Sequence, residues 1–176
     1  KNVVLPEYAY HFDSPVGVIV VLYAEDPFAL TRVLLPGERD FPDEPGAKAP
    51  IRPSVQKQVL CIHRFFAAYF EKKPVPVPWD LLNFSGFTPL ERLVWEKTAD
   101  IPFGHTAAYS DIAMAMGRPL ASRFTGSALG KNPFPVMIPC HRVIRKDGGL
   151  GGFGSGIDMK RKLLSFEGVL LQPVLA

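Results

Sequence analysis

Residues 74–91 read PVPVPWDLLNFSGFTPLE, and this stretch separates two parts of the chain that have different patterns. The three prolines at alternate positions end a helical pattern and predict a stiff connector. The Thr-Pro-Leu-Glu segment at 88–91 then has the features of a helix start, with Thr as N-cap, proline in the first turn and Glu at N3. We therefore expect two domains, residues 1–85 and 86–176.

The first part is predicted to be a small α/β domain that opens with strands. Runs rich in β-branched and aromatic residues flank Ser14-Pro15-Val16-Gly17, which suits a hairpin connection. Further along, apolar residues recur at steps of three and four, which indicates a helix. Cys61 falls in that helix, and we interpret it as a small, partly buried and inert side chain. The expected elements are strands over 8–13, 17–23 and 29–35, a loop over 36–53, a helix over 54–70 and an edge strand over 81–84.

The second part is predicted to be mostly helical. The expected helices cover residues 88–99, 109–116, 120–129 and 158–167, the last with Asp158 as its N-cap. Two short helices on either side of Gly117 favour a helix-turn-helix, although an ordinary αα-hairpin has the same pattern. Both interpretations remain open on the residues alone.

Three kinds of chemistry compete for residues 131–156. Gly149–Gly154 (GLGGFG) matches the G-x-G-x-x-G pattern, but the acidic residue that a dinucleotide site needs about 20 residues later would fall almost at the end of the 176-residue chain. We interpret these glycines as a loop. Val136–Ile138 reads as a buried strand ended by proline, and Cys140 and His141 follow. A reactive thiol, a buried structural cysteine and a Cys–His hydrolase all fit this order.

Composition limits the class of protein. The chain has 176 residues, 47% of them hydrophobic and 21% charged, which excludes disordered and fibrous classes. The sequence has no apolar run of about 18 residues, so we expect no membrane span. Two cysteines and four scattered histidines predict neither a disulfide framework nor a metal site, which favours a cytoplasmic location. Residues 1–85 carry 9 basic and 10 acidic side chains, and residues 86–176 carry 11 and 7. The second part therefore has the more positive net charge, and we expect a polyanion to bind there.

The segment Asn132–Ile144, NPFPVMIPCHRVI, resembles the active-site signature of the O6-alkylguanine-DNA alkyltransferases, also called methylated-DNA–protein-cysteine methyltransferases. The family's core Pro-Cys-His-Arg-Val stands here at 139–143. The similarity extends over most of residues 86–170 in the family's order and spacing. The first part is similar only in being a small, strand-rich domain that opens with a Ser-Pro-Val-Gly hairpin.

The resemblance implies a fold and an activity. The fold would be α/β with two domains: an N-terminal RNase H-like sheet domain and a C-terminal, mostly helical winged-helix or helix-turn-helix domain. The second domain would bind double-stranded DNA in the minor groove and flip an alkylated guanine into a pocket. Cys140 would then take the O6-alkyl group irreversibly, once per molecule, with no cofactor; O4-alkylthymine is a second candidate substrate. The alternative is a non-catalytic DNA-binding protein that senses lesions.

The same resemblance assigns roles by position. Cys140 would be the alkyl acceptor, His141 its base through a water, and Glu167 the residue that orients His141. Asn132 would brace the turn, and Tyr109 would help to rotate the nucleotide and donate to guanine N3. The implied DNA-binding residues are Arg123, which would fill the gap in the base stack, Tyr109, Gly126, Ser127 and Ala128. The implied pocket residues are Pro135, Val143, Phe153, Gly154 and Ser155, with the carbonyls of Cys140 and Val143 accepting from the guanine amino group.

Two departures from the family pattern stand out. Phe124 and Thr125 follow Arg123 where the family usually has small residues, and Phe153 replaces a tyrosine that many members have, so one hydroxyl near O6 is missing. We expect a monomer that does not bind membranes and that acts where DNA is: with the nucleoid in the cytoplasm of a prokaryote, or in the nucleus of a eukaryote.

Overall fold

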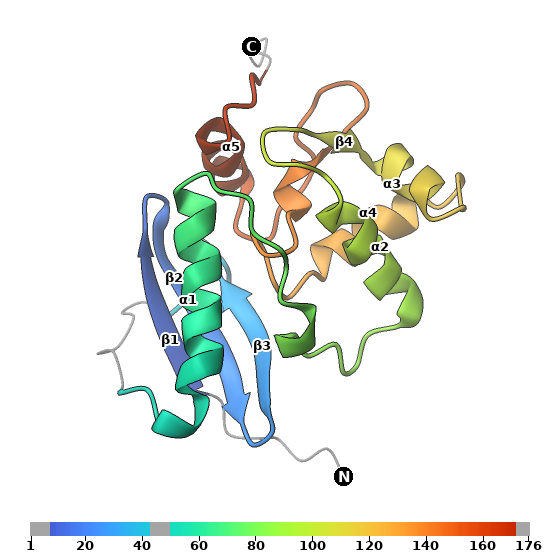
Figure 1. The fold of residues 1–176 in the computed structure, drawn as a ribbon. Helices are drawn as coiled ribbons and strands as arrows, with labels where there is room; N and C mark the ends of the chain where they lie inside the picture. Colours follow the sequence, from blue (N-terminus) through green and yellow to red (C-terminus); the bar gives the residue numbers. More distant parts are fainter. Residues whose placement is uncertain (1–7, 43–49, 172–176) are drawn as a thin grey trace. The chain divides into compact units, whose positions relative to one another are not determined.

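The computed structural model describes residues 8–42 and 50–171, which form a mixed α/β structure (Figure 1). The chain divides into two compact units, Lys1–Ser85 and Gly86–Ala176. Each unit has its own secondary structure, and no helix within the described residues is both long enough and apolar enough to cross a membrane.

The first unit contains an antiparallel sheet of three strands in the order β1-β2-β3. The strands are β1 (Tyr8–Ser14), β2 (Gly17–Glu25) and β3 (Phe28–Leu34), so the three predicted strands are confirmed with ends that differ by one or two residues. The predicted hairpin connection is confirmed as well, because Ser14 pairs with Gly17 and its hydroxyl donates to the Gly17 carbonyl at 2.6 Å. Glycine suits this place because its φ is 116°, in the region that other residues avoid.

Helix α1 (Gln56–Phe70) lies across one face of this sheet and is preceded by a 3₁₀ turn, Pro53–Val55 (Figure 1). The apolar stripe that predicted the helix is buried, as its spacing requires: Val55, Val59, Ile62, Phe66 and Tyr69. Cys61 is exposed on the other side of the helix. The expectation of partial burial was therefore wrong for Cys61, because position 61 falls outside the stripe.

The predicted edge strand over 81–84 is wrong. A 3₁₀ helix, Trp79–Leu81, occupies its start, and only a single parallel bridge joins Leu82 to Leu30. The chain turns away directly afterwards, because the Asn83 side chain accepts from the backbone N–H of Ser85 at 2.8 Å. Of the predicted loop over 36–53, residues 43–49 lie outside the described residues.

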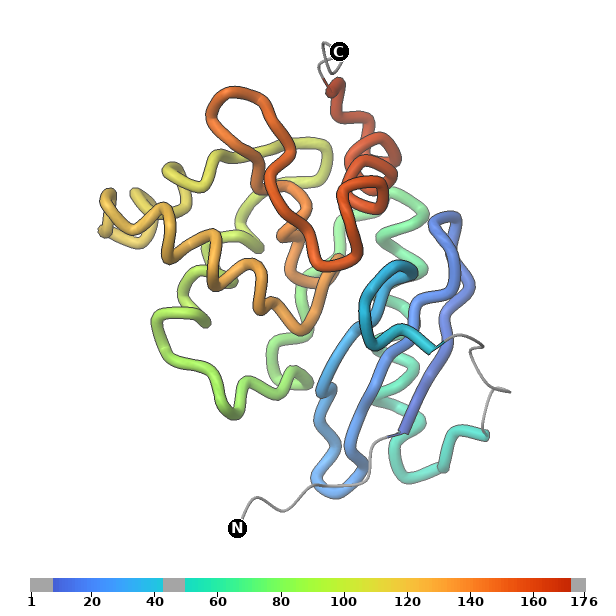
Figure 2. Tube along the Cα trace, turned by 180° about the vertical axis from the view of Figure 1, so that it is seen from behind, coloured from blue at the N-terminus to red at the C-terminus, as the bar shows by residue number. Residues whose placement is uncertain are grey.

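The second unit is mostly helical. Its elements are α2 (Pro89–Ala99), β4 (Ala107–Ala108), α3 (Tyr109–Ala115), α4 (Ser122–Gly130), a 3₁₀ helix (Cys140–Arg142), β5 (Val143–Ile144) and α5 (Ile157–Phe166). Strands β4 and β5 form a short parallel pair. A long loop leads from β5 back to α5, and it is seen from behind in orange in Figure 2.

The start of α2 is the predicted capping box. Thr88 Oγ1 accepts from the Glu91 N–H at 3.2 Å, and Glu91 Oε2 accepts from the Thr88 N–H at 2.8 Å. The other carboxylate oxygen of Glu91 accepts from Lys131 Nζ at 2.7 Å. The same carboxylate therefore joins the first turn of α2 to the residue that ends α4.

Two helix starts differ from the prediction. Helix α4 begins at Ser122 rather than 120, because Arg118 and Ala121 first form a turn closed by an N–H to carbonyl bond of 2.9 Å, which leaves Leu120 exposed. Helix α5 has Gly156 as its N-cap, with φ of 87°, so Asp158 lies within the first turn instead of capping it. In both cases the backbone of the preceding turn sets the start of the helix.

Candidate functional site

The turn before the second cysteine is organised by Asn132. Its Oδ1 accepts from the Phe134 N–H at 3.0 Å, and its Nδ2 donates to the Ile138 carbonyl at 3.0 Å and to Cys140 Sγ at 3.1 Å. The predicted strand at 136–138 is wrong: the segment is a buried turn in which Val136 has φ of 73°. Such a backbone is strained for a β-branched residue, so the amide of Asn132 stabilises a turn that the local sequence disfavours.

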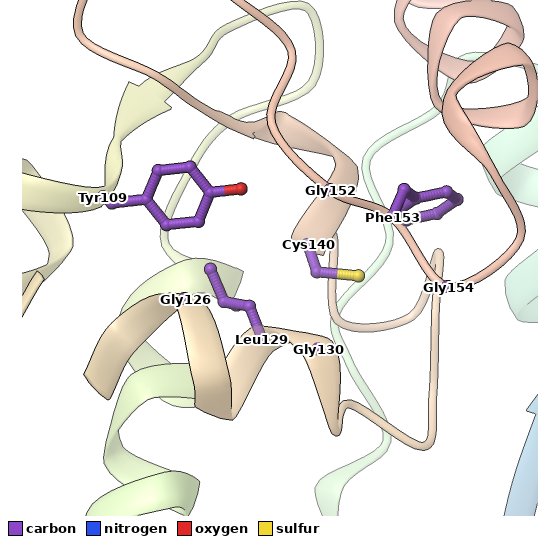
Figure 3. A pocket seen from close by; sticks show the side chains of 8 residues that line it. All are labelled: Tyr109, Gly126, Leu129, Gly130, Cys140, Gly152, Phe153 and Gly154. Atoms are coloured by element: carbon purple, nitrogen blue, oxygen red, sulfur yellow. The ribbon is translucent and has the colours of Figure 1, made fainter. Parts of the chain in front are cut away.

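Cys140 lies at a pocket of about 400 Å³ (Figure 3). It is the first residue of the 3₁₀ helix and is 8% exposed, so it is largely buried at the edge of this pocket. The pocket is lined by Tyr109, Gly126, Leu129, Gly130, Cys140, Gly152, Phe153 and Gly154. Four of these eight are glycines, so the backbone itself forms much of the wall.

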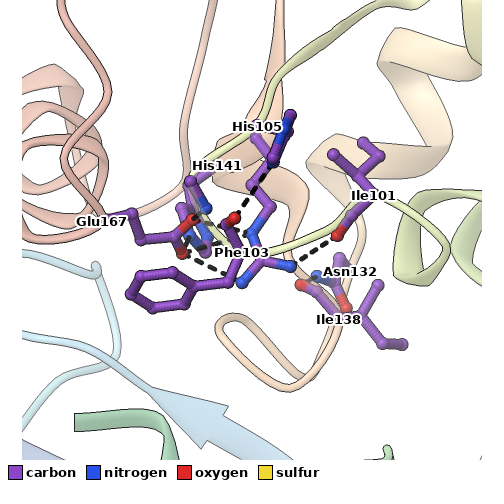
Figure 4. Close-up of polar contacts among 9 residues, drawn as sticks. Ile101, Phe103, His105, Asn132, Ile138, His141 and Glu167 are labelled. Carbon is purple, nitrogen blue, oxygen red and sulfur yellow. Dashed lines mark hydrogen bonds and ion pairs between the residues drawn. The ribbon is translucent and has the colours of Figure 1, made fainter. Parts of the chain in front are cut away.

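A buried ion network lies next to Cys140 in the chain (Figure 4). His141 Nε2 is 2.6 Å from Glu167 Oε1, and Arg142 donates to both oxygens of the same carboxylate, with its Nε 2.9 Å from Oε2. Burial opposes the charge of Glu167, but the hydrogen bonds from His141, Arg142 and the Gly104 N–H outweigh it and lower its pKa to about 2. Glu167 is thus a carboxylate at neutral pH.

That carboxylate fixes the protonation of His141. A carboxylate only accepts, so Nε2 must carry the proton, and Nδ1 of the neutral ring then carries the lone pair. Burial lowers the pKa of His141 below its ordinary value, and the partly opposing influence of Glu167 does not reverse this. The site therefore presents a neutral imidazole, which can take up a proton.

Arg142 ties the network to a second segment. Its Nη1 donates to the Ile101 carbonyl at 2.6 Å, and its guanidinium lies 5.7 Å from the centre of the Phe103 ring. The Gly104 N–H donates to Glu167 Oε2 at 2.9 Å. These contacts join the segment Ile101–Gly104 to the residues that follow the cysteine, and no role was predicted for Arg142.

Tyr109 reaches the pocket from the first residue of α3 (Figure 3). Burial raises its pKa, and a negative charge on the nearby Cys140 adds to this, so the phenol keeps its proton. Gly151, with φ of 70°, leaves room for the ring, because a Cβ there would lie 2.5 Å from the Tyr109 hydroxyl oxygen.

Helix α4 divides the predicted DNA-binding residues between two faces. Arg123 and Ser127 are exposed, and Gly126 lines the pocket. Ala128 is buried, and its carbonyl accepts from the Trp95 indole N–H at 3.0 Å. Its side chain faces the interior, so the contribution of Ala128 is to packing and not to an exposed face.

The predicted pocket residues also divide. Phe153 and Gly154 line the pocket, whereas Pro135, Val143 and Ser155 are buried and do not belong to its lining. Leu129 and Gly130 were missed as lining residues, and so were two buried cations, Arg142 and Lys160. Leu129 and Gly130 could have been found from the helical spacing of three and four after Gly126.

Fold and site together define a class: a protein that places its own cysteine at a small pocket, beside a neutral histidine held by a buried carboxylate, within a helical unit that follows a small sheet domain. The family model "6-O-methylguanine DNA methyltransferase, DNA binding domain" matches residues 89–169. A relative from Acanthamoeba polyphaga mimivirus, named "Probable methylated-DNA--protein-cysteine methyltransferase", is 49% identical over 158 residues, 88% of this chain and 93% of that protein.

Two further comparisons agree. The methylated-DNA–protein-cysteine methyltransferase of Methanothermobacter thermautotrophicus is 45% identical over 98 residues, and the match spans about half of that protein, 54%. The crystal structure of Mycobacterium tuberculosis OGT in complex with DNA superposes with a TM-score of 0.67 at 32% identity and covers 89% of this chain and 90% of that one. The chain belongs to the methylated-DNA–protein-cysteine methyltransferase family.

Proposed function

We propose that this chain repairs O6-alkylguanine in DNA by transferring the alkyl group irreversibly to its own Cys140. The observation that carries the proposal is the position of the Cys140 sulfur: it lies at the pocket, 3.1 Å from Asn132 Nδ2, and the next residue is a neutral histidine bound to a buried carboxylate. The family to which the chain belongs supports the same chemistry.

The proposed transfer is a displacement at the alkyl carbon. His141 takes the thiol proton through a water, and Glu167 stabilises the imidazolium that forms. The thiolate of Cys140 then attacks, so that a sulfur–carbon bond forms, the carbon–O6 bond breaks, and its electron pair remains on guanine O6. Tyr109, which keeps its proton, donates to guanine N3. The product is a thioether, and nothing in this chemistry regenerates the thiol, so each molecule reacts once.

We infer that residues 86–176 are the DNA-binding and alkyl-transfer domain and that residues 1–85 are an α/β domain of the RNase H-like type. In this proposal α3 and α4 form a helix-turn-helix within a winged-helix domain that enters the minor groove. Flipping a base costs a few kcal/mol, and Arg123, exposed on α4, would fill the gap that the flipped guanine leaves. The small residues Gly126 and Ser127 would let the backbone of α4 approach the DNA closely.

The remaining parts of the proposal follow from the substrate. The carbonyls of Cys140 and Val143 would accept from the guanine amino group, which tells guanine from adenine. The protein would act as a monomer without a cofactor, where DNA lies: in the cytoplasm with the nucleoid, or in a nucleus. Phe153 would stack beside the base without donating to O6, because it has no hydroxyl.

The test is to incubate the protein with duplex DNA that contains O6-methylguanine and to map the added mass by peptide. We expect one methyl group per protein molecule, on Cys140. The Cys61→Ser variant should react fully, and this control matters because Cys61 is exposed. Cys140→Ser should bind the duplex and gain no mass. Binding of the lesion by the unmodified protein without any adduct would instead identify a non-catalytic lesion sensor and contradict the proposal.

A further inference from the structure

Leu120 is the most exposed large apolar side chain in the part of the chain that the structure describes. It is 99% exposed, so water surrounds almost all of it. An apolar side chain stabilises a fold through the area that it removes from water, and Leu120 therefore contributes almost nothing to the stability of this unit. Single exposed apolar residues are common on protein surfaces. A role for Leu120 therefore has to follow from its neighbours in the structure.

A stiff turn holds Leu120 in place. The Ala121 N–H donates to the Arg118 carbonyl at 2.9 Å, and Pro119, whose ring fixes φ, lies between them. The Thr125 N–H donates to the Ala121 carbonyl at 2.8 Å, so the turn continues directly into α4. The connection between α3 and α4 lies at an edge of the second unit (Figure 1). Leu120 is therefore presented to solvent on an ordered backbone, and its binding to a partner costs little chain entropy.

The charged side chains on either side of Leu120 in the sequence are basic. Arg118 precedes it by two residues, Arg123 follows it by three, and both are exposed. From residue 112 to residue 146 the chain has six basic side chains and no Asp or Glu. An apolar side chain within such a segment fits a partner that has accessible apolar surface between rows of negative charge. A DNA duplex has this character, because its phosphates border grooves that are floored by the edges of the bases.

The position of Arg123 indicates where on the duplex Leu120 would lie. Arg123 is the second residue of α4, and its proposed role is to fill the gap that the flipped guanine leaves. Three residues rise about 4.5 Å along a helix, and consecutive base pairs are about 3.4 Å apart. Leu120 is thus within reach of the base step next to the gap. Leucine is one of the side chains that minor-groove proteins insert between base pairs, which partly unstacks the pairs and kinks the duplex.

We propose that Leu120 enters the minor groove beside the damaged base and packs against the adjoining base step, so that it helps to open the stack around the lesion. This rests on the DNA repair function proposed above. Leu120 makes and breaks no bond, and it acts on the duplex before the alkyl group is transferred. It is a positioning residue, and a free base, which has no stack to open, does not need it.

The experiment first measures binding without chemistry. In a Cys140→Ser background, the protein is titrated onto a duplex that contains O6-methylguanine and has 2-aminopurine, which fluoresces more strongly when it is unstacked, as the adjoining base. We expect Leu120→Ser to weaken binding about tenfold, since burial of most of a leucine side chain gives at least that factor. At saturation, the same variant should lose most of the rise in fluorescence. Leu120→Met keeps an apolar side chain and should retain both the affinity and the rise.

The second measurement uses proteins that keep Cys140. Leu120→Ser should slow transfer from the duplex about tenfold and leave transfer from free O6-benzylguanine at the wild-type rate. The dependence of binding on salt separates an apolar contact from a charged one: Leu120→Ser should keep the wild-type slope of affinity against salt concentration, because it removes no phosphate contact.

Leu170→Ser is the matched control. Leu170 is 97% exposed in the same unit, so this variant removes an equally exposed leucine from a different place in the chain. Binding, fluorescence and transfer should all stay at the wild-type values.

Three results would overturn the proposal. The first is wild-type binding and fluorescence in Leu120→Ser. The second is weaker binding with the full rise in fluorescence, since Leu120 would then touch the DNA without opening the stack. The third is self-association of the free protein, measured by sedimentation, that Leu120→Ser abolishes while DNA binding is unchanged, since this would make Leu120 a contact between copies. If the wild-type protein bound damaged duplex and formed no adduct, the proposed repair function would fail, but the comparison in the Cys140→Ser background would still decide the role of Leu120.

Discussion

Replacing Glu167 by Gln tests the buried network that holds the histidine beside the reactive thiol. The carboxylate accepts from His141, from Arg142 at both oxygens, and from the Gly104 N–H. A glutamine keeps the shape and one acceptor oxygen. It removes the charge, so Arg142 is left buried without its counter-charge. The amide nitrogen of the glutamine is itself a donor, so it cannot accept a hydrogen bond from the N–H groups that face it.

The loss can be estimated from the carboxyl's pKa. Its folded value of about 2 lies 2.5 units below the ordinary value of 4.5, which corresponds to about 3 kcal/mol of stability at neutral pH. Because the pKa of Glu167 is lowered on folding, this contribution is present above about pH 4.5 and is lost as the pH falls towards about 2. Breaking a buried ion pair costs about 3–5 kcal/mol. We therefore expect Glu167→Gln to lose about 3 kcal/mol at pH 7 and much less at acidic pH.

The assay is urea unfolding followed by the emission of Trp95, which is fully buried in the same unit, in a Trp79→Phe background. Glu96→Gln is the matched control, because the ion pair of Glu96 with Arg92 is exposed and should contribute no more than about 0.5 kcal/mol. Transfer should slow at least tenfold while duplex binding is kept. A loss below about 1 kcal/mol at pH 7, or transfer at the wild-type rate, would refute the reasoning.

Three other changes have defined outcomes. Gly151→Ala places a Cβ 2.5 Å from the Tyr109 hydroxyl oxygen, so the rate of transfer should fall with both free O6-benzylguanine and duplex DNA. Gly148→Ala is the control, because Gly148 also has a positive φ but has open space around it. This variant should lose only about 1 kcal/mol of stability, measured by urea unfolding, and should transfer at the wild-type rate. Arg123→Ala should slow transfer from duplex DNA and leave transfer from the free base unchanged. Arg123→Lys should restore little of the loss, because Lys has no planar face. Equal impairment with both substrates would reject the proposal that Arg123 fills the gap in the base stack. Asn132→Asp should slow alkylation of the reactive cysteine by iodoacetamide, because a carboxylate would then replace the donor 3.1 Å from its sulfur; an unchanged rate would show that this donor does not matter.

Local signals in the sequence predicted what local contacts determine. The capping box of α2 depends on Thr88 and Glu91, three residues apart, and the structure confirms it. The turn at 136–138 could not be predicted in this way. An apolar run between prolines looks the same whether it is a strand or a buried turn, and here the amide of Asn132, several residues earlier, decides.

The buried lysine is an example of a residue near the site that could not be predicted from the sequence. Lys160 stands between a methionine and Arg161-Lys162, a pattern typical of a solvated helix face. Its burial depends on carbonyls 8 and 17 residues away in sequence, which only the folded loop brings together. The acceptor cysteine could be singled out because its signature is contiguous, whereas a residue defined by long-range backbone contacts has no comparable pattern.

The ion pair between Glu91 and Lys131 limits where this chain could be shortened. Lys131 is bound to Glu91, which lies 40 positions earlier in the first turn of α2, and is followed directly by Asn132. The turn that positions the Cys140 sulfur therefore begins one residue after this ion pair. Removal of α2 would free that anchor and would also take away Trp95, whose indole fixes α4 at Ala128. The shortest piece able to present its thiol in the right place would therefore begin ahead of Thr88, even if α3, α4 and α5 still formed within a smaller fragment.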